Sequence, residues 1–205
     1  MEFHIENTEV YGLNKSIIAS GNAMRTKMAN NTEDPTEKDL KRAKILGAAQ
    51  CGHGHDNFLN GIIVQFDLYA PLYMWKQIQR YHFMDFISSQ STMHRLSNFN
   101  IAAQCTKDVD QIILNRYEEM LKEYHEKENN DPILWRSLVA SLPCGFVLGA
   151  TMTTNYRQLK TIYLQRKNHK LKEWHEFCAW CESLPYFIEL VGLENNNKNT
   201  SEIVE

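Results

Sequence analysis

Residues 77–95 concentrate side chains that can bind an anion or the edge of a nucleobase. The segment, QIQRYHFMDFISSQSTMHR, contains two arginines, two histidines and a polar run from Ser88 to Ser91. Gln77 and Arg80 are three residues apart, so on a helix they point in similar directions. Hydroxyl, amide and guanidinium groups, including that of Arg95, suit a phosphate or a base edge. The alternative is a helix with a buried apolar stripe and a solvated polar face.

A second candidate binding element begins at Asn155. This residue is a good N-cap, and Gln158 three residues later is the expected capping-box partner. Arg157 then lies in the first helical turn, where the helix dipole disfavours a cation. An anion bound at this helix end would relieve that conflict and use the free backbone N–H groups. The alternative is a surface arginine that bends away. Arg166, at the far end of the same helix, suits the dipole and requires no ligand.

Cys178 and Cys181 form a single C-x-x-C sequence on a predicted helix. Zinc would need two further ligands, for which His175, His53 or His55 can be proposed. Because the predicted helix also carries large apolar side chains, a buried pair of thiols is the favoured interpretation, and we expect no metal site.

Cys144, within SLPCG, is the other cysteine with a possible chemical role. A nucleophilic cysteine needs a thiolate and an activating neighbour. Here the next residue is Gly145, and the chain then continues into an apolar, β-rich sequence. We therefore expect no cysteine to be catalytic.

The composition limits the classes of partner. A chain of 205 residues with 43% hydrophobic residues can bury a substantial core. The net charge of −3 creates no general attraction for nucleic acid or an anionic membrane. The sequence shows neither a secretory leader nor an apolar run long enough to span a bilayer, and its five cysteines are typical of reduced thiols. We expect a cytoplasmic protein that binds neither nucleic acid nor membrane.

Helical and strand-like patterns alternate along the chain. Residues 62–69 alternate apolar and polar side chains, which predicts a strand with one buried face. Thr36 and Asp39 carry a capping signal for the helix that follows. The helix from Pro71 is expected to place Leu72, Trp75, Ile78, His82 and Phe86 on one stripe, to fray near residues 85–88 and to lead into a polar loop. The other expected helices cover residues 12–28, 36–50, 109–127, 133–142, 156–167 and 171–184, and a second strand covers residues 146–155.

These patterns predict an α+β fold with a small antiparallel sheet flanked by helices. We expect one domain over residues 1–190 and a disordered polar tail over residues 191–205.

Three ordered segments resemble the flavin-dependent thymidylate synthases, and the resemblance covers most of the chain. AMRT (residues 23–26) is similar to an early Ala-Ala-Arg segment of that family. Residues 55–82 are similar to its Gly-His segment, strand, Ala-Pro-led helix and Arg-His-Arg signature. Residues 142–166 are similar to its Leu-Pro, strand, Asn-x-Arg and final arginine. The resemblance implies the small-sheet fold above and an assembly of four identical subunits that share active sites.

The resemblance also implies residue roles. Arg166 corresponds to the arginine that contacts the pyrimidine and activates it. The positions that correspond to FAD contacts are His55, Asn57, Arg80, Tyr81, His82, Asn155, Arg157 and Thr161. The positions expected to contact a nucleotide such as dUMP are Gln77, Arg80, Ser88, Ser89, Gln90, Ser91, Arg95 and Arg166. His55 also has a simpler interpretation as a loop-capping histidine.

The chain departs from the family pattern at several positions. The signature is Arg80-Tyr81-His82 instead of Arg-His-Arg, and Gln90 replaces a glutamate in the following motif. Val139 replaces an arginine, which weakens the expected phosphate contact. These changes indicate a divergent member that holds the nucleotide differently or binds a different nucleotide.

The implied reaction is methylation of dUMP to dTMP with FAD as cofactor and with methylenetetrahydrofolate and NADPH as co-substrates. Two alternatives remain. One is a non-catalytic relative that retains a nucleotide or flavin pocket. The other is an enzyme that modifies C5 of a pyrimidine to a different product.

Overall fold

The computed structural model describes residues 1–29, 34–50 and 53–193. Within this part the chain forms two compact units. The first comprises Met1–Glu6, Asp67–Arg80 and Phe86–Met152, and the second comprises the described residues of Asn7–Phe66, Tyr81–Asp85 and Thr153–Glu205. Of the expected tail, residues 194–205 lie outside the described part. Val191 and Leu193, at its predicted start, are buried.

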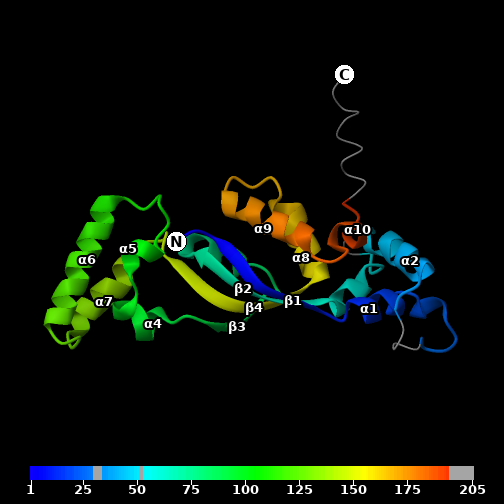
Figure 1. Cartoon of the computed structure of the whole chain (residues 1–205), viewed down its shortest axis with the longest axis horizontal. Coiled ribbons are helices and arrows are strands. Elements are labelled where there is room, and N and C mark those ends of the chain that lie inside the picture. Colours follow the sequence, from blue (N-terminus) through cyan, green and yellow to red (C-terminus); the bar gives the residue numbers. More distant parts are fainter. Residues whose placement is uncertain (30–33, 51–52, 194–205) are drawn as a thin grey trace, which may run out of the picture. The chain divides into compact units, whose positions relative to one another are not determined.

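A four-stranded antiparallel sheet confirms the predicted α+β class. Its strands are β1 (His4–Tyr11), β2 (Ile63–Pro71), β3 (Asp85–Ser89) and β4 (Val147–Asn155), in the order β1-β2-β4-β3 (Figure 1). The alternation predicted for β2 is confirmed, because Val64, Phe66 and Leu68 are at most 1% exposed while Gln65 and Asp67 are half-buried. Strand β4 leads directly into helix α8, so it fixes the position of that helix's first turn.

The first unit contains a helical hairpin with its own apolar core. Helices α6 (Gln111–Glu126) and α7 (Pro132–Ser141) lie side by side (Figure 1). The Asp110 and Asp131 carboxylates cap their first turns, and the buried Tyr117 hydroxyl donates to the Leu138 carbonyl over 2.9 Å. The remaining helices of the unit are α3 (Leu72–Ile78), α4 (Thr92–Arg95), the 3-10 helix η3 (Leu96–Asn98) and α5 (Ile101–Gln104).

The second unit packs helices around a core of large aromatic side chains. Trp174, Tyr156, Phe177 and Phe187 are fully buried. A side chain at Gly47 would meet the Leu190 carbonyl at 1.9 Å, so only glycine permits this approach of two helices. The elements are α1 (Leu13–Ala19), η1 (Asn22–Met24), α2 (Glu37–Gly47), η2 (Asn57–Gly61), α8 (Tyr156–Arg166), α9 (Lys172–Ser183) and α10 (Phe187–Val191).

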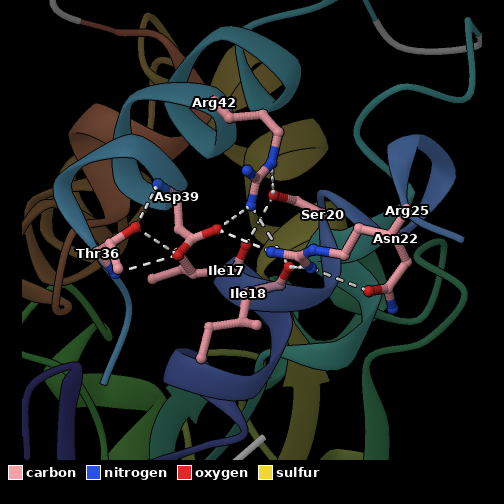
Figure 2. A network of polar contacts seen from close by, with 8 residues as sticks. All are labelled: Ile17, Ile18, Ser20, Asn22, Arg25, Thr36, Asp39 and Arg42. Atoms are coloured by element: carbon pink, nitrogen blue, oxygen red, sulfur yellow. Dashed lines mark hydrogen bonds and ion pairs between the residues drawn. The ribbon is translucent and has the colours of Figure 1, made fainter. Parts of the chain in front are cut away.

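A polar network joins the start of α2 to the end of α1 (Figure 2). The predicted capping box is confirmed: Thr36 and Asp39 exchange hydrogen bonds between side chain and backbone. Asp39 also pairs with Arg42 and Arg25, and both arginines donate to the carbonyl of Ile18. The Thr36 hydroxyl and the Arg42 guanidinium hold the pKa of Asp39 well below its usual range. The network therefore stabilises this corner in the charged state of Asp39.

The prediction for residues 71–95 is wrong in part. Helix α3 ends at Ile78, so Arg80, Tyr81, His82 and Phe86 are not on it. The expected long stripe therefore does not form, and Gln77 and Arg80 do not share a helical face. Strand β3 occupies residues where fraying and a loop were expected, because its backbone pairs with the distant β4 and this outweighs local side-chain competition. Just beyond β3, the Gln90 N–H donates to the Gly149 carbonyl over 2.9 Å.

Two smaller differences concern the N-terminal part. Strand β1 was not predicted from the sequence, and the helix expected over residues 12–28 is the short α1 followed by η1. Across the described residues, no helix is both long and apolar enough to cross a membrane.

Candidate functional site

A small cavity lies at the N-terminus of α8 in the second unit. It has a volume of about 170 Å³ and is lined by Asn60, Phe83, Asn155, Arg157, Gln158 and Thr161. It brings together three predicted cofactor residues: Asn155, Arg157 and Thr161. The Asn155 side chain accepts a hydrogen bond from the Gln158 N–H over 2.9 Å, so the predicted N-cap is confirmed. The cavity is below the usual size of a drug-sized ligand site and suits a group such as one phosphate or sugar.

The conflict expected at Arg157 is relieved by the protein itself. Asp56, which is fully buried, places Oδ1 3.1 Å from Arg157 Nε and Oδ2 3.3 Å from Lys160 Nζ. The contact of Oδ1 is an ion pair without hydrogen-bond geometry. Lys160 also donates to the carbonyls of Gly47 and Ala49 over 2.7 and 2.6 Å. Two cations thus face one carboxylate, which leaves a net charge of +1 beside the cavity.

Few backbone donors remain at this helix end. The Tyr156 N–H donates to the Ile62 carbonyl, and the Gln158 N–H donates to Asn155. A bound anion would therefore rely on the Arg157 guanidinium and on the local positive charge more than on a set of free N–H groups. Asp56 carried no signal in the sequence, since its partners lie about a hundred residues further along the chain.

His55 and Asn57 are exposed and line a different cavity of the second unit. This cavity measures about 690 Å³, and its walls are mainly apolar. Its other lining residues are Ala19, Ser20, Ala23, Met24, Arg42, Leu46, Gly54 and Phe58. The two predicted cofactor residues therefore do not share the small cavity at α8.

Arg166, the predicted catalytic residue, is the last residue of α8 and is 9% exposed. Its Cζ lies 4.6 Å from the ring centre of Trp174 and 5.4 Å from that of Tyr81. Its Nε donates to the Tyr81 hydroxyl over 2.6 Å, and that hydroxyl is 3.2 Å from Gln165 Oε1. Burial, with the charge of Arg166, lowers the pKa of His169. Aromatic rings and a tyrosine hydroxyl thus contact the guanidinium.

Phe83 is a candidate residue that the sequence did not single out. It lines the α8 cavity, its side chain is 68% exposed and its φ is 60°. A bulky residue in the left-handed region is strained, and such strain concentrates at functional sites. The only sequence signal is a phenylalanine directly after Arg-Tyr-His. Its neighbour His82, a predicted cofactor residue, is exposed on the same turn.

The first unit contains a second small cavity, of about 190 Å³. Its lining residues are Asp67, Tyr69, Ser88, Ser89, Gln90, Gly149, Ala150 and Thr151. Three predicted nucleotide residues, Ser88, Ser89 and Gln90, therefore lie together. The Gln90 side chain accepts a hydrogen bond from the Gly149 N–H over 2.9 Å. The Thr151 hydroxyl donates to Asp67 over 2.6 Å, so the cavity contains a carboxylate as well as the expected hydroxyls.

The other predicted nucleotide residues of this unit do not line that cavity. Ser91 is the N-cap of α4 and accepts from the His94 N–H, and Arg95 is the exposed last residue of α4. Gln77 is half-buried in the last turn of α3, and Arg80 is exposed just beyond it.

The cysteines within the described part of the chain are buried thiols or lie apart from the cavities. Cys178 and Cys181 are buried on α9, and burial raises the pKa of both thiols, that of Cys178 to about 11. Cys144 is exposed between α7 and β4. Among the described residues, no group of three or more potential metal-ligating side chains is present.

The fold is that of the flavin-dependent thymidylate synthases. No family model matches the sequence, and no curated protein matches it. Among solved structures, the Helicobacter pylori flavin-dependent thymidylate synthase ThyX, complexed with FAD and dUMP, is similar with a TM-score of 0.69 and 15% identity. That similarity covers 93% of this chain and 97% of the other.

Two further structures support the same fold. A second structure of the Helicobacter pylori enzyme with FAD and dUMP has a TM-score of 0.65 and 15% identity, covering 93% of this chain and 96% of that one. The UMP/dUMP methylase PolB from Streptomyces cacaoi, bound to 5-Br dUMP, has a TM-score of 0.64 and 13% identity. This similarity covers 94% of this chain and 95% of the PolB chain.

Proposed function

We propose that this protein is a flavin-dependent enzyme that modifies C5 of a pyrimidine nucleotide, and that its reaction is the methylation of dUMP. The observation that carries the proposal is the fold, which is shared over 93% of the chain with an enzyme solved with FAD and dUMP. The sequence resemblance adds motifs in matching order, and two cavities contain residues from those motifs.

The second unit carries most of the proposed flavin contacts. Asn155, Arg157 and Thr161 fit a phosphate or sugar portion of FAD, because they line a cavity of suitable size beside a net positive charge. When bound and reduced, FAD supplies the hydride that turns the transferred one-carbon unit into a methyl group. The further proposed contacts are those implied by the sequence resemblance at His55, Asn57, Arg80, Tyr81 and His82.

The first unit carries the proposed contacts to the nucleotide. Ser88, Ser89 and Gln90 line a polar cavity, and Arg95 is the exposed cation of the short helix that follows. Gln77, Arg80 and Ser91 complete the proposed set. Because Asp67 disfavours a phosphate in the small cavity, we assign Ser88 and Ser89 to a neutral polar part of the nucleotide and Arg95 to its phosphate.

Arg166 is the proposed catalytic residue. C5 of a uracil is a weak nucleophile, and a fixed positive charge beside C2–O2 and N3 makes it more reactive by stabilising the charge that develops there. An arginine remains protonated at neutral pH, so Arg166 acts as an electrostatic group and not as a proton carrier. Methylenetetrahydrofolate supplies the one-carbon unit, NADPH reduces the flavin, and we propose a homotetramer.

Three observations favour a second candidate, a relative that binds a nucleotide but has another product or no turnover. Arg166 is largely covered by aromatic rings, and the family's signature histidine and a phosphate-binding arginine are replaced by Tyr81 and Val139. One neighbour, moreover, is a UMP/dUMP methylase.

Reconstitution with FAD separates these candidates. The protein is saturated with FAD, and flavin oxidation is followed with NADPH, methylenetetrahydrofolate and either dUMP or UMP, with product identified by mass spectrometry. A 5-methylated nucleotide supports the proposal. A bound flavin with no nucleotide product supports the non-catalytic relative. A protein that takes up no FAD refutes the proposal.

A further inference from the structure

Asp56 joins the start of η2 to the first two turns of α8. It is the N-cap residue of η2 and is fully buried, although it carries a carboxylate. Its Oδ1 lies 3.1 Å from Arg157 Nε, and its Oδ2 lies 3.3 Å from Lys160 Nζ. A carboxylate between two cations of one helix neutralises charge, and it also determines where the more exposed cation points.

Lys160 holds this carboxylate in place. Its ammonium group is 3% exposed and donates to the carbonyls of Gly47 and Ala49 as well as to Asp56. These three acceptors match the three N–H donors of a lysine, so the ammonium group and the carboxylate have little freedom to move. Asp56 is therefore a fixed anchor within the second unit.

Arg157 is the more exposed partner of Asp56. Its side chain is 32% exposed and lines the cavity at α8, so it stays accessible to a ligand while it is paired with Asp56. Without this pair, the helix dipole and the ammonium group of Lys160, three residues further along α8, would both repel the guanidinium. The arginine would then turn to solvent, which is the alternative that the sequence leaves open. Asp56 removes that alternative.

We propose that Asp56 is a positioning residue, which holds the Arg157 guanidinium at the wall of the cavity so that it contacts a phosphate of the flavin cofactor. This inference rests on the proposed function of the cavity, and it adds a residue that no sequence motif marks. A guanidinium that is already in place loses less conformational entropy when the ligand binds. Asp56 therefore increases the affinity for an anion although it is itself negatively charged.

A variant of unchanged net charge tests this role. Asp56→Asn combined with Lys160→Met removes one negative and one positive charge, so the anchor is lost while the net charge of +1 beside the cavity remains. We expect the Kd for FAD, measured by the change in flavin fluorescence, to rise by roughly three- to tenfold, the cost of ordering one long side chain on binding. A Kd within about twofold of wild type would overturn the proposal.

A double-mutant cycle with Arg157→Ala separates positioning from a general structural effect. In the Arg157→Ala background there is no guanidinium to position, and the paired substitution of Asp56 and Lys160 again leaves the net charge unchanged. The paired substitution should therefore cause no further loss of FAD affinity in that background. An equal loss in both backgrounds would show that Asp56 acts through the fold and not through Arg157, which would also overturn the proposal.

Tyr117→Phe is the control for lost stability. It deletes a buried hydroxyl that donates to the Leu138 carbonyl in the first unit, so it should lower the urea midpoint without changing the Kd for FAD. A rise in Kd as large as that of the paired variant would assign the effect to stability, against the proposal.

A measurement on the free protein tests the contact without a ligand. In ¹⁵N-labelled protein, the Nε–H signal of Arg157 is identified by its absence in Arg157→Ala. We expect its heteronuclear NOE to be that of an ordered group in wild type and to fall to that of a mobile side chain in Asp56→Asn, with or without Lys160→Met. An unchanged NOE refutes the positioning role.

The outcomes distinguish this inference from the proposed function. A wild-type protein that takes up no FAD refutes the proposed function, and the ligand assigned to Arg157 falls with it. A wild-type protein that binds FAD, combined with a paired variant of equal affinity, refutes this inference alone.

Discussion

Asp56 should be among the residues on which stability depends most, although no sequence motif marks it. The substitution Asp56→Asn keeps the shape and removes the charge. Its carboxylate is fully buried, and Lys160 is only 3% exposed, so the lysine would retain its charge without a counter-ion. Removing one partner of a buried ion pair costs about 3–5 kcal/mol.

The lower end of that range applies here. The amide oxygen introduced by Asp56→Asn can still accept from Lys160, and the carbonyls of Gly47 and Ala49 continue to accept from the same ammonium group. Arg157 contributes less, because its side chain is 32% exposed and water screens its charge. We expect a loss of about 3 kcal/mol, which lowers the urea midpoint by about 1.5 M at a slope of about 2 kcal/mol/M.

Urea unfolding at pH 7, followed by circular dichroism, measures this loss. Lys160→Met serves as the matched variant, because it removes the buried cation and leaves Asp56 paired with Arg157. The double variant Asp56→Asn with Lys160→Met should be more stable than the sum of the single losses predicts, since it leaves no unpaired buried charge between these two positions. A loss below about 1 kcal/mol for Asp56→Asn, at unchanged slope, would refute the assignment of Asp56 as a stabilising counter-ion.

Three further predictions concern other parts of the molecule. Because the pKa of Asp39 is held low in the folded state, its contribution to stability is present above its unfolded value near pH 4 and is lost as the pH falls below it. When the free energy of unfolding is measured at decreasing pH, it should therefore fall less steeply in Asp39→Asn than in wild type. Cys144→Ala should retain activity, and a loss above a thousandfold in a folded, FAD-bound protein would restore a nucleophilic role. Arg95→Ala should mainly weaken dUMP binding, by roughly 1.5–3 kcal/mol, whereas Arg166→Ala should mainly lower kcat; normal binding and turnover in both would remove these residues from the site.

Features that depend on neighbouring residues were predictable from the sequence. The Thr36 capping box, the Asn155 N-cap and the alternation of β2 each involve residues within a few positions of one another. Local hydrogen bonding and side-chain periodicity decide these elements, so they need no knowledge of the tertiary structure. The same local reasoning placed α8 and α9 correctly.

Features that depend on distant residues were not predictable. β3 is exposed along its whole length and carries no alternation, so only its pairing with β4 makes it a strand. The Tyr81 contact to Arg166 joins residues 85 positions apart, and the Asp56 contact to Lys160 joins residues 104 apart. Neither contact left a local pattern in the sequence that could reveal the partner.

The charges around α8 link these distant contacts to the proposed flavin site. The sequence leaves open whether Arg157 faces an anionic ligand or bends away from the helix end, and Asp56 supplies part of the negative charge that it needs. Because Lys160 shares the same carboxylate, one positive charge remains in excess beside the cavity. The excess charge lies on Arg157, whose side chain is 32% exposed, so water screens it in the free protein and an anion bound in the cavity would pair with it directly. The arrangement therefore favours a protein that is more stable with its anionic ligand bound than without it.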